Sequence, residues 1–270
     1  MTVPPPLFLG LLDDAAIFPP GNVEMPEAVR AYRERRGLPL LGAFICALPR
    51  WGELRENLTG GPPLPVALTV PGGTGDVAAA IALARAEPRV ELAALEVPAS
   101  AEGTAALAKT VDRMVVTYVE LPWAEVTETT VAVLADAGLR LKIRTGGVVA
   151  SAFPDERRLA GVLEVAVRGG IPFKLTAGLH DPIRHRAPDT GFEHHGYLNV
   201  LLATARALEG GDVTAALADQ DGPRVASAVA HIDDVLAQRI RRHFVSFGTC
   251  SITEPVDGLL RHGLLPEDPR

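Results

Sequence analysis

Short runs of apolar and β-branched residues recur along the chain, each bounded by glycine, proline or polar residues. Runs of four to eight such residues are typical of strands buried on both faces. The sequence contains eight of them, at residues 7–12, 42–48, 65–70, 90–97, 114–121, 139–145, 171–177 and 244–248. We therefore expect eight strands.

Helical spacing of apolar residues fills most of the intervals between these runs. The clearest segments are residues 26–36, 76–87, 127–137 and 155–168, with Thr74 and Thr127 as expected N-caps and Gly138 and Gly169 as stops. Alternating strands and helices predict parallel strands with crossover helices, and eight such units close a (β/α)8 barrel, the TIM barrel. A doubly wound open sheet is the main alternative.

The connection between the seventh and eighth runs, residues 178–243, is about 65 residues long and must carry extra structure. We predict helices at 197–208 and 224–241 and a long ordered loop at 178–196. The sequence contains no repeat or linker, so residues 1–270 are predicted to form a single α/β barrel domain with a long helical insertion.

Composition narrows the class of partner. A net charge of −7 and a pI near 5.5 argue against binding to nucleic acid, so a small molecule is expected. No run approaches the roughly 18 apolar residues of a membrane span, and no signal peptide is recognised, so we expect a cytoplasmic protein with no membrane partner. Cys46 and Cys250, the two cysteines, support neither a disulfide framework nor a cysteine zinc site.

Alternation along the strands places charged residues inside the predicted barrel. In the sixth strand Arg140, Lys142 and Arg144 share one face, and this charged face cannot pack against the apolar helix layer. The same alternation points the following side chains inward near the carboxyl ends of their strands, where barrel enzymes have their active sites: Glu96, Glu120, Lys174 and Thr176. The first strand ends in Asp13 and Asp14.

Two interpretations of these charges remain open. Buried charges must be paired or bind a ligand, and a structural ion pair of Lys142 with Glu120 would satisfy this requirement. Alternatively, burial and a neighbouring cation, Lys174 or Arg144, would lower the pKa of Lys142 and give a free amine that attacks a carbonyl. Lysine is scarce, since only 3 of the 26 basic residues are lysines, so such chemistry falls on Lys142, Lys174 or Lys109.

The motifs LKIRTGG, which ends at Gly147, and FKLTAG, residues 173–178, resemble those of deoxyribose-phosphate-type class I aldolases. The resemblance covers these two strands only. It implies that Lys142 forms a Schiff base, that Lys174 lowers the pKa of Lys142, and that Glu120 moves protons. The final strand, FVSFGTCS, lacks the serine-rich phosphate loop of that family, and the long insertion is a second departure. The runs FKLTAGLHDPIR and HHGYLN also resemble those of bacterial barrel proteins, and this likeness implies no activity.

The end of the last predicted strand and the loop after the seventh supply further candidates. Gly248 and Thr249 precede a helix that begins near Thr253, and backbone N–H groups there suit an anion, although a simple N-cap explains the same residues. Cys250 acts as a nucleophile only if a base lies beside it. Asp13 either binds a substrate hydroxyl or caps the following turn.

Histidines are concentrated in the predicted loop. It contains His180, Asp181, His185, His194 and His195. Histidines with a carboxylate can bind a divalent metal, but their spacing fixes no ligand geometry, so no cofactor is predicted and a divalent metal stays an alternative. We expect one or two of them, His180 and His195 foremost, to contact substrate.

Three functions follow. The first is a class I aldolase-like lyase in which Lys142, Lys174 and Glu120 act on a small carbonyl or carboxylate substrate that contacts Arg144, Asp13, Glu96, Thr176, His180, His195, Gly248 and Thr249. The second is a metal-dependent lyase, isomerase or hydrolase that uses aspartate, glutamate and histidine ligands. The third is a non-catalytic ligand-binding barrel. We expect an enzyme, and whether it forms a homo-oligomer stays open.

Overall fold

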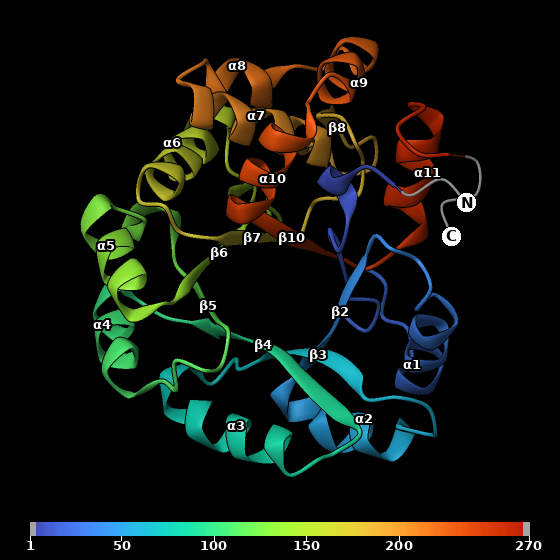
Figure 1. Ribbon diagram of the computed structural model, residues 1–270, viewed down its shortest axis with the longest axis vertical. Coiled ribbons are helices and arrows are strands. Elements are labelled where there is room, and N and C mark those ends of the chain that lie inside the picture. The colour runs from blue at the N-terminus through green and yellow to red at the C-terminus, as the bar shows by residue number, and fades with distance from the viewer. Residues whose placement is uncertain (1–3, 267–270) are drawn as a thin grey trace.

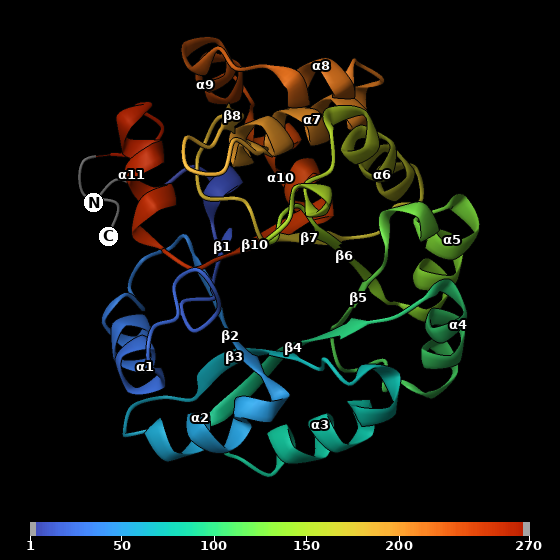
Figure 2. The same cartoon turned by 180° about the vertical axis from the view of Figure 1, so that it is seen from behind.

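A closed barrel of eight parallel strands forms the centre of the protein, as a computed structural model that describes residues 4–266 shows (Figures 1 and 2). The strands run in the order β1-β10-β7-β6-β5-β4-β3-β2 around the barrel. Their bounds are β1 Leu12–Asp14, β2 Leu41–Ala47, β3 Leu64–Thr69, β4 Val90–Pro98, β5 Thr117–Glu120, β6 Arg140–Arg144, β7 Phe173–Thr176 and β10 Phe244–Thr249. The predicted (β/α)8 barrel is confirmed.

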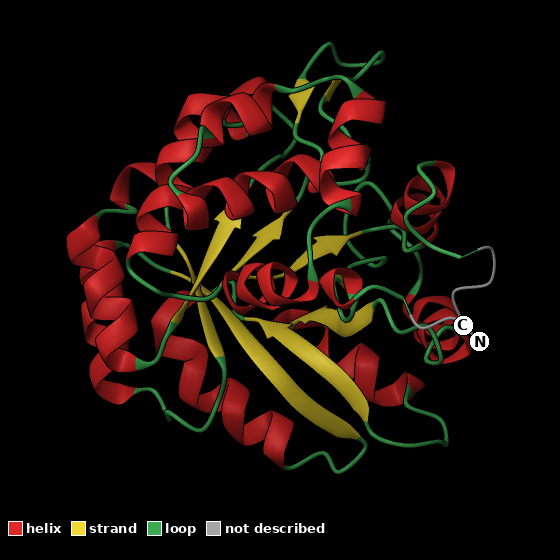
Figure 3. Ribbon diagram, turned by 45° about the horizontal axis from the view of Figure 1, so that its top comes forward, coloured by secondary structure: helices red, strands yellow, loops and turns green. Residues whose placement is uncertain are grey.

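Helices surround the barrel on the outside, so that both faces of every strand are covered (Figure 3). Their bounds are α1 Met25–Glu34, α2 Trp51–Asn57, α3 Val77–Arg85, α4 Ala101–Thr110, α5 Glu128–Ala137, α6 Glu156–Arg168, α7 Tyr197–Glu209, α8 Val213–Ala218, α9 Gly222–Ala230, α10 Asp234–His243 and α11 Thr253–Arg261. Helices α7 to α10 gather beside β7 and β10 and form the predicted helical insertion (Figure 1). No helix within residues 4–266 is long and apolar enough to cross a membrane.

Several boundaries differ from the sequence-based expectation. The first apolar run forms a 3-10 helix, Pro6–Phe8, before β1, so the prediction of a strand at residues 7–12 is wrong and Asp13 lies within the strand. The run at 114–121 contributes a strand only from Thr117. Thr74 lies in a 3-10 turn and does not cap α3. By contrast, Thr127 accepts a hydrogen bond from Thr130 N and caps α5 as expected.

The insertion contains more elements than the two predicted helices. Residues 224–241 form two helices, because Asp233 caps a new helix by accepting a hydrogen bond from the Leu236 N–H. The short helix α8 was not predicted. Within the loop at 178–196, β8 His185–Arg186 and β9 Glu193–His194 pair as a small antiparallel hairpin.

The main hydrophobic core lies between the strands and the helices, and a second, smaller apolar cluster fills part of the barrel interior. This second cluster consists of Ile45, Ala67, Ala94 and Tyr118 from β2, β3, β4 and β5. The small side chains of Ala67 and Ala94 leave room in the barrel for long charged side chains, which come from β1, β6 and β7 and from the carboxyl-terminal parts of β4 and β5. The barrel interior is therefore divided into an apolar half and a charged half.

Candidate active site

Lys174 of β7 lies at the centre of the charged half of the barrel. Its Nζ donates hydrogen bonds to Asp13 Oδ2 at 2.6 Å and to Glu96 Oε1 at 2.5 Å, so it joins β7 to strands β1 and β4 across the barrel. Asp13 also accepts hydrogen bonds from Ser246 Oγ and Ala43 N. The aromatic ring of Tyr118 lies 5.5 Å from the ammonium. Lys174 is thus enclosed and fully paired.

Lys142 of β6 lies next to Lys174 in strand register and points into the same interior. Its Nζ is 2.9 Å from Glu96 Oε2 and 2.9 Å from Glu120 Oε2. These two contacts are ion pairs whose angles fall outside hydrogen-bond geometry, which leaves Glu96 Oε2 without a formal hydrogen bond. Lys142 is therefore buried and paired with two carboxylates, as Lys174 is.

The charges form one continuous network. Glu96 bridges the two lysines, and Glu120 continues from Lys142 to Arg144, whose Nε donates to Glu120 Oε1 at 2.8 Å. The expected pairing of Lys142 with Glu120 is present. The network leads from Asp13, which is buried, to Arg144, which is exposed at the end of β6.

Neighbouring charges set the protonation of these groups. Burial by itself would raise the pKa of Glu96, but the charges of Lys142 and Lys174 outweigh it and lower this pKa to about 2. For Lys174, burial by itself would lower the pKa, but the negative charges of Asp13 and Glu96 outweigh burial and raise this pKa. The pKa of Glu120 is lowered by Lys142 and Arg144 against the effect of burial. Lys174 is therefore a cation whose charge is offset by two carboxylates, which the expectation of a neighbouring cation acting on Lys142 did not include.

A cavity of about 580 Å³ opens beside the outer end of this network. Glu120 and Arg144 form its polar side. The rest of its wall comes from the end of β4, from the segments that follow β4 and β5, and from the segment after β6. These residues are Pro98, Ala99, Ser100, Leu121, Pro122, Trp123 and Ala152. The indole N–H of Trp123 donates to the Arg144 carbonyl at 2.7 Å, and this bond fixes the wall of the cavity. The cavity lies at the carboxyl ends of the strands, where barrel enzymes have their active sites.

The other predicted mouth residues lie on β7 and β10. Thr176 is opposite Gly248 in strand register, and a Cβ at Gly248 would lie 3.7 Å from Thr176 Oγ1. Thr249 is buried, and its hydroxyl donates to the Ser251 carbonyl at 2.9 Å, so it shapes the turn before α11. A Cβ at position 248 would also come within 3.0 Å of the end of the Ile45 side chain, which would have to shift slightly.

Two of the predicted histidines occupy very different environments. His195 is 1% exposed, its Nε2 lies 2.8 Å from the Pro154 carbonyl and its Nδ1 lies 3.3 Å from Arg184 Nη1. Burial lowers its pKa to about 4. His195 therefore ties α6 to the loop, and both of its ring nitrogens are occupied. His180 is partly exposed beside Glu254 and Cys250.

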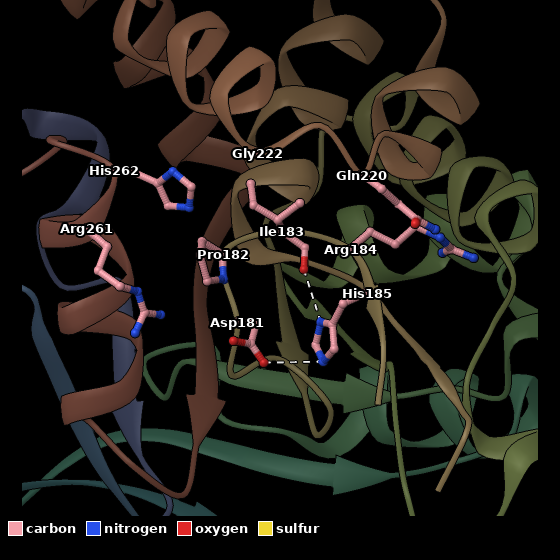
Figure 4. A pocket seen from close by; sticks show the side chains of 9 residues that line it. All are labelled: Asp181, Pro182, Ile183, Arg184, His185, Gln220, Gly222, Arg261 and His262. Carbon is pink, nitrogen blue, oxygen red and sulfur yellow. Dashed lines mark hydrogen bonds and ion pairs between the residues drawn. The ribbon is translucent and has the colours of Figure 1, made fainter. Parts of the chain in front are cut away.

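A second cavity, of about 340 Å³, lies between the loop after β7 and the helices α9 and α11 (Figure 4). Asp181 Oδ2 lies 3.3 Å from His185 Nε2 along its lower side. Arg261 and His262 approach it from α11. Within residues 4–266, no group of three or more histidine, cysteine, aspartate or glutamate side chains is arranged to hold a metal ion.

Sequence reasoning missed three partners. Ser246 binds Asp13, Tyr118 packs on Lys174, and Glu254 binds His180. Ser246 was detectable, because strand alternation places it on the same face as Gly248. Glu254 was not, since its meeting with His180 depends on how the loop after β7 folds over α11.

Comparison with known proteins adds no family to this description. No protein-family model matches the chain, and a search of curated proteins finds no match.

Proposed function

We propose that the protein is a class I lyase that uses Lys142 to form a Schiff base with a small carbonyl substrate. The observation that supports this proposal best is the position of Lys142 Nζ, 2.9 Å from the carboxylates of both Glu96 and Glu120, beside a cavity that Glu120 and Arg144 border. A lysine between two carboxylates has proton acceptors within reach of the reacting nitrogen. Lys174 is unsuited to the same role, because it is 1% exposed and neither of its partners, Asp13 and Glu96, borders the cavity.

The reaction begins with a proton transfer. Lys142 gives a proton to Glu120, and the free amine attacks the carbonyl carbon to form a carbinolamine. Glu120 returns the proton to the hydroxyl group, which leaves as water, and the iminium forms. Its positive charge takes the place of the ammonium beside Glu96, so the network stays balanced. The bond between the carbons α and β to the iminium carbon then breaks, and its electron pair forms an enamine while Glu120 takes the proton of the β-hydroxyl group, so that the other fragment leaves as an aldehyde. Glu120 returns this proton to the enamine carbon, and water hydrolyses the resulting iminium, which releases the second product and restores the ammonium of Lys142.

The cavity also suggests the class of substrate. Its walls are mainly apolar, with Leu121, Pro122 and Trp123 on one side, while Arg144 has its guanidinium at the rim and is 47% exposed in its side chain. An apolar wall with one arginine suits a 2-oxo acid or an aldehyde with an apolar substituent.

Trapping with borohydride tests the proposal. The protein is incubated with separate aldehydes, ketones and 2-oxo acids in the presence of borohydride, digested and mapped by mass spectrometry. We expect a stable adduct on Lys142 and none on Lys174, and Lys142→Arg removes it. Lys109, which is exposed on α4, is the internal control for nonspecific reductive alkylation. Absence of any adduct on Lys142, or equal labelling of Lys109, would overturn the proposal.

The metal-dependent alternative is supported less well by the geometry. It needs Asp13, Glu96 and Glu120 as ligands, whereas each of these carboxylates is paired with a lysine. A metal ion would have to displace both ammonium groups. The non-catalytic alternative predicts a ligand that binds without any borohydride adduct, so the same experiment distinguishes it.

A further inference from the structure

Cys250 has an imidazole and a carboxylate beside it. Its Sγ lies 3.9 Å from both Nδ1 and Nε2 of His180, and His180 Nδ1 lies 2.9 Å from Glu254 Oε2. No other hydrogen bond to His180 Nε2 occurs among residues 4–266. Because Sγ is equidistant from the two ring nitrogens, it is not aligned on Nε2, but thiol, imidazole and carboxylate lie together as the nucleophile, the base and the orienting group of a triad do.

Barrel topology brings these three residues together. Strands β7 and β10 are neighbours, with Thr176 opposite Gly248 in register. His180 follows β7, Cys250 follows β10, and Glu254 lies in the first turn of α11, where its backbone N–H donates to Ser251 Oγ. All three lie at the carboxyl ends of the strands, the end used for catalysis in this fold.

The surroundings of His180 favour its protonated form. Hydrogen bonding to Cys250 raises the pKa of His180 to about 9 against the effect of burial, and Glu254 adds to the rise. An imidazolium beside a thiol stabilises the thiolate, which is the nucleophilic form. The other cysteine, Cys46, is 0% exposed, and burial raises its pKa to about 12.

The thiol is also within reach of a ligand. Cys250 is half-buried, and the side chain of His180 is 23% exposed. The loop after β1 passes beside the thiol at Gly21, where a Cβ would come within 3.0 Å of Cys250 Cβ. Glycine there allows the loop to pack closely against Cys250.

We propose that Cys250, His180 and Glu254 form a second reactive centre, which takes activated acyl groups such as esters and thioesters. The Cys250 thiolate attacks the acyl carbon, a sulfur–carbon bond forms, and the bond to the leaving alcohol or thiol breaks. His180 gives its proton to the leaving group. It then takes a proton from water, which hydrolyses the acyl-cysteine to the free acid and restores the thiolate. No lysine takes part, so this centre is independent of the Schiff-base proposal.

Acylation by p-nitrophenyl acetate tests the assignment. We expect a burst of about one p-nitrophenolate per chain and a single acetyl group that maps to Cys250, with none on Cys46. His180→Ala should slow the burst at least tenfold, and Glu254→Gln should slow it less. His231→Ala is the matched control, because His231 is exposed at the end of α9 and bonds only to Ser227 among the described residues. Lys142→Arg should leave the burst unchanged.

Two results would overturn the proposal. Cys250→Ser is nearly isosteric, and a burst of full size in this variant would show that another group is acylated. Acylation of Cys250 at the same rate in His180→Ala as in the native chain would show an exposed thiol without a base. Circular dichroism of each variant verifies that its fold is intact before the rates are compared.

Discussion

At the scale of single residues, Lys174 and Lys142 differ in how much of the network depends on them. Lys174 is 1% exposed and is the partner shared by Asp13 and Glu96. Lys142 is paired with two carboxylates that each have a second cation: Glu96 also contacts Lys174, and Glu120 also contacts Arg144. Removal of Lys142 therefore leaves each of its carboxylates with a cation, whereas removal of Lys174 leaves Asp13 with none among the described ion pairs.

Stability measurements on two matched variants test this difference. Lys174→Met should lower the free energy of unfolding by about 3–5 kcal/mol, the usual effect of breaking a buried ion pair from one side. Lys142→Met should lower it by less. Urea unfolding followed by circular dichroism measures both. Equal losses would mean that the two lysines contribute equally to the network.

Ionisation of Glu96 gives the stability of the barrel a defined pH dependence. The lysines lower the pKa of Glu96 from 4.5 to about 2. A carboxyl group whose pKa is lower in the folded state stabilises the fold above its unfolded pKa and loses this contribution as the pH falls through its folded pKa. We expect about 3 kcal/mol to be lost between about pH 5 and pH 2.

Glu96→Gln isolates this contribution, because the glutamine cannot ionise while other carboxylates titrate in both proteins. The difference in unfolding free energy between the native chain and the variant should shrink as the pH falls from about 5 to 2. If the two curves run parallel, Glu96 does not contribute through its charge.

Strand alternation was enough to predict that Lys142 and Lys174 point inward and that Glu120 lies near Lys142. It did not predict that Asp13 and Glu96 would neutralise Lys174, because alternation gives the face of a strand and not its height in the barrel. That height depends on the tilt and stagger of all eight strands. The expectation that Lys174 acts on Lys142 as a neighbouring cation rested on alternation in adjacent strands and on the aldolase resemblance, and neither reveals that Glu96 lies between the two ammonium groups.

At the scale of elements, local hydrogen bonds decided the boundaries that hydrophobic spacing left open. Apolar spacing continues from residue 224 to 241, yet the chain leaves the helix at His231 and starts α10 after Asp233. The side chain of Asp233 accepts a hydrogen bond from Leu236 N at 2.7 Å. A capping bond of this kind involves only four residues, so apolar periodicity over a longer window does not detect it.

Asp233→Ala should therefore lower the free energy of unfolding by about 1 kcal/mol, the usual effect of losing an N-cap. Gln238→Ala is the matched control, since Gln238 is exposed in the interior of α10 and alanine is a good helix former. Thermal unfolding of the two variants provides the measurement. A loss in Gln238→Ala as large as in Asp233→Ala would contradict a specific role for the cap.

At the scale of the whole molecule, one network links opposite sides of the barrel. Strands β1, β4, β5, β6 and β7 all contribute charged side chains to this network. Strands β2 and β3 contribute the apolar side chains of Ile45 and Ala67 to the interior. The number and order of strands could be predicted from the alternation of strand and helix, because parallel strands with short crossovers close at eight units. The division of the interior into an apolar and a charged half could not, since it depends on which strands face each other after closure.

The two catalytic functions considered for this barrel respond in opposite ways to chelation. With the carbonyl compound that labels Lys142, cleavage should proceed unchanged after dialysis against EDTA, because a Schiff base needs no metal ion to stabilise the developing negative charge. Borohydride added with the substrate should abolish cleavage, whereas borohydride added alone and removed beforehand should not, which controls for damage to the protein. Loss of activity on chelation, with recovery after a divalent ion is restored, would instead assign the reaction to the carboxylates Asp13, Glu96 and Glu120 as metal ligands.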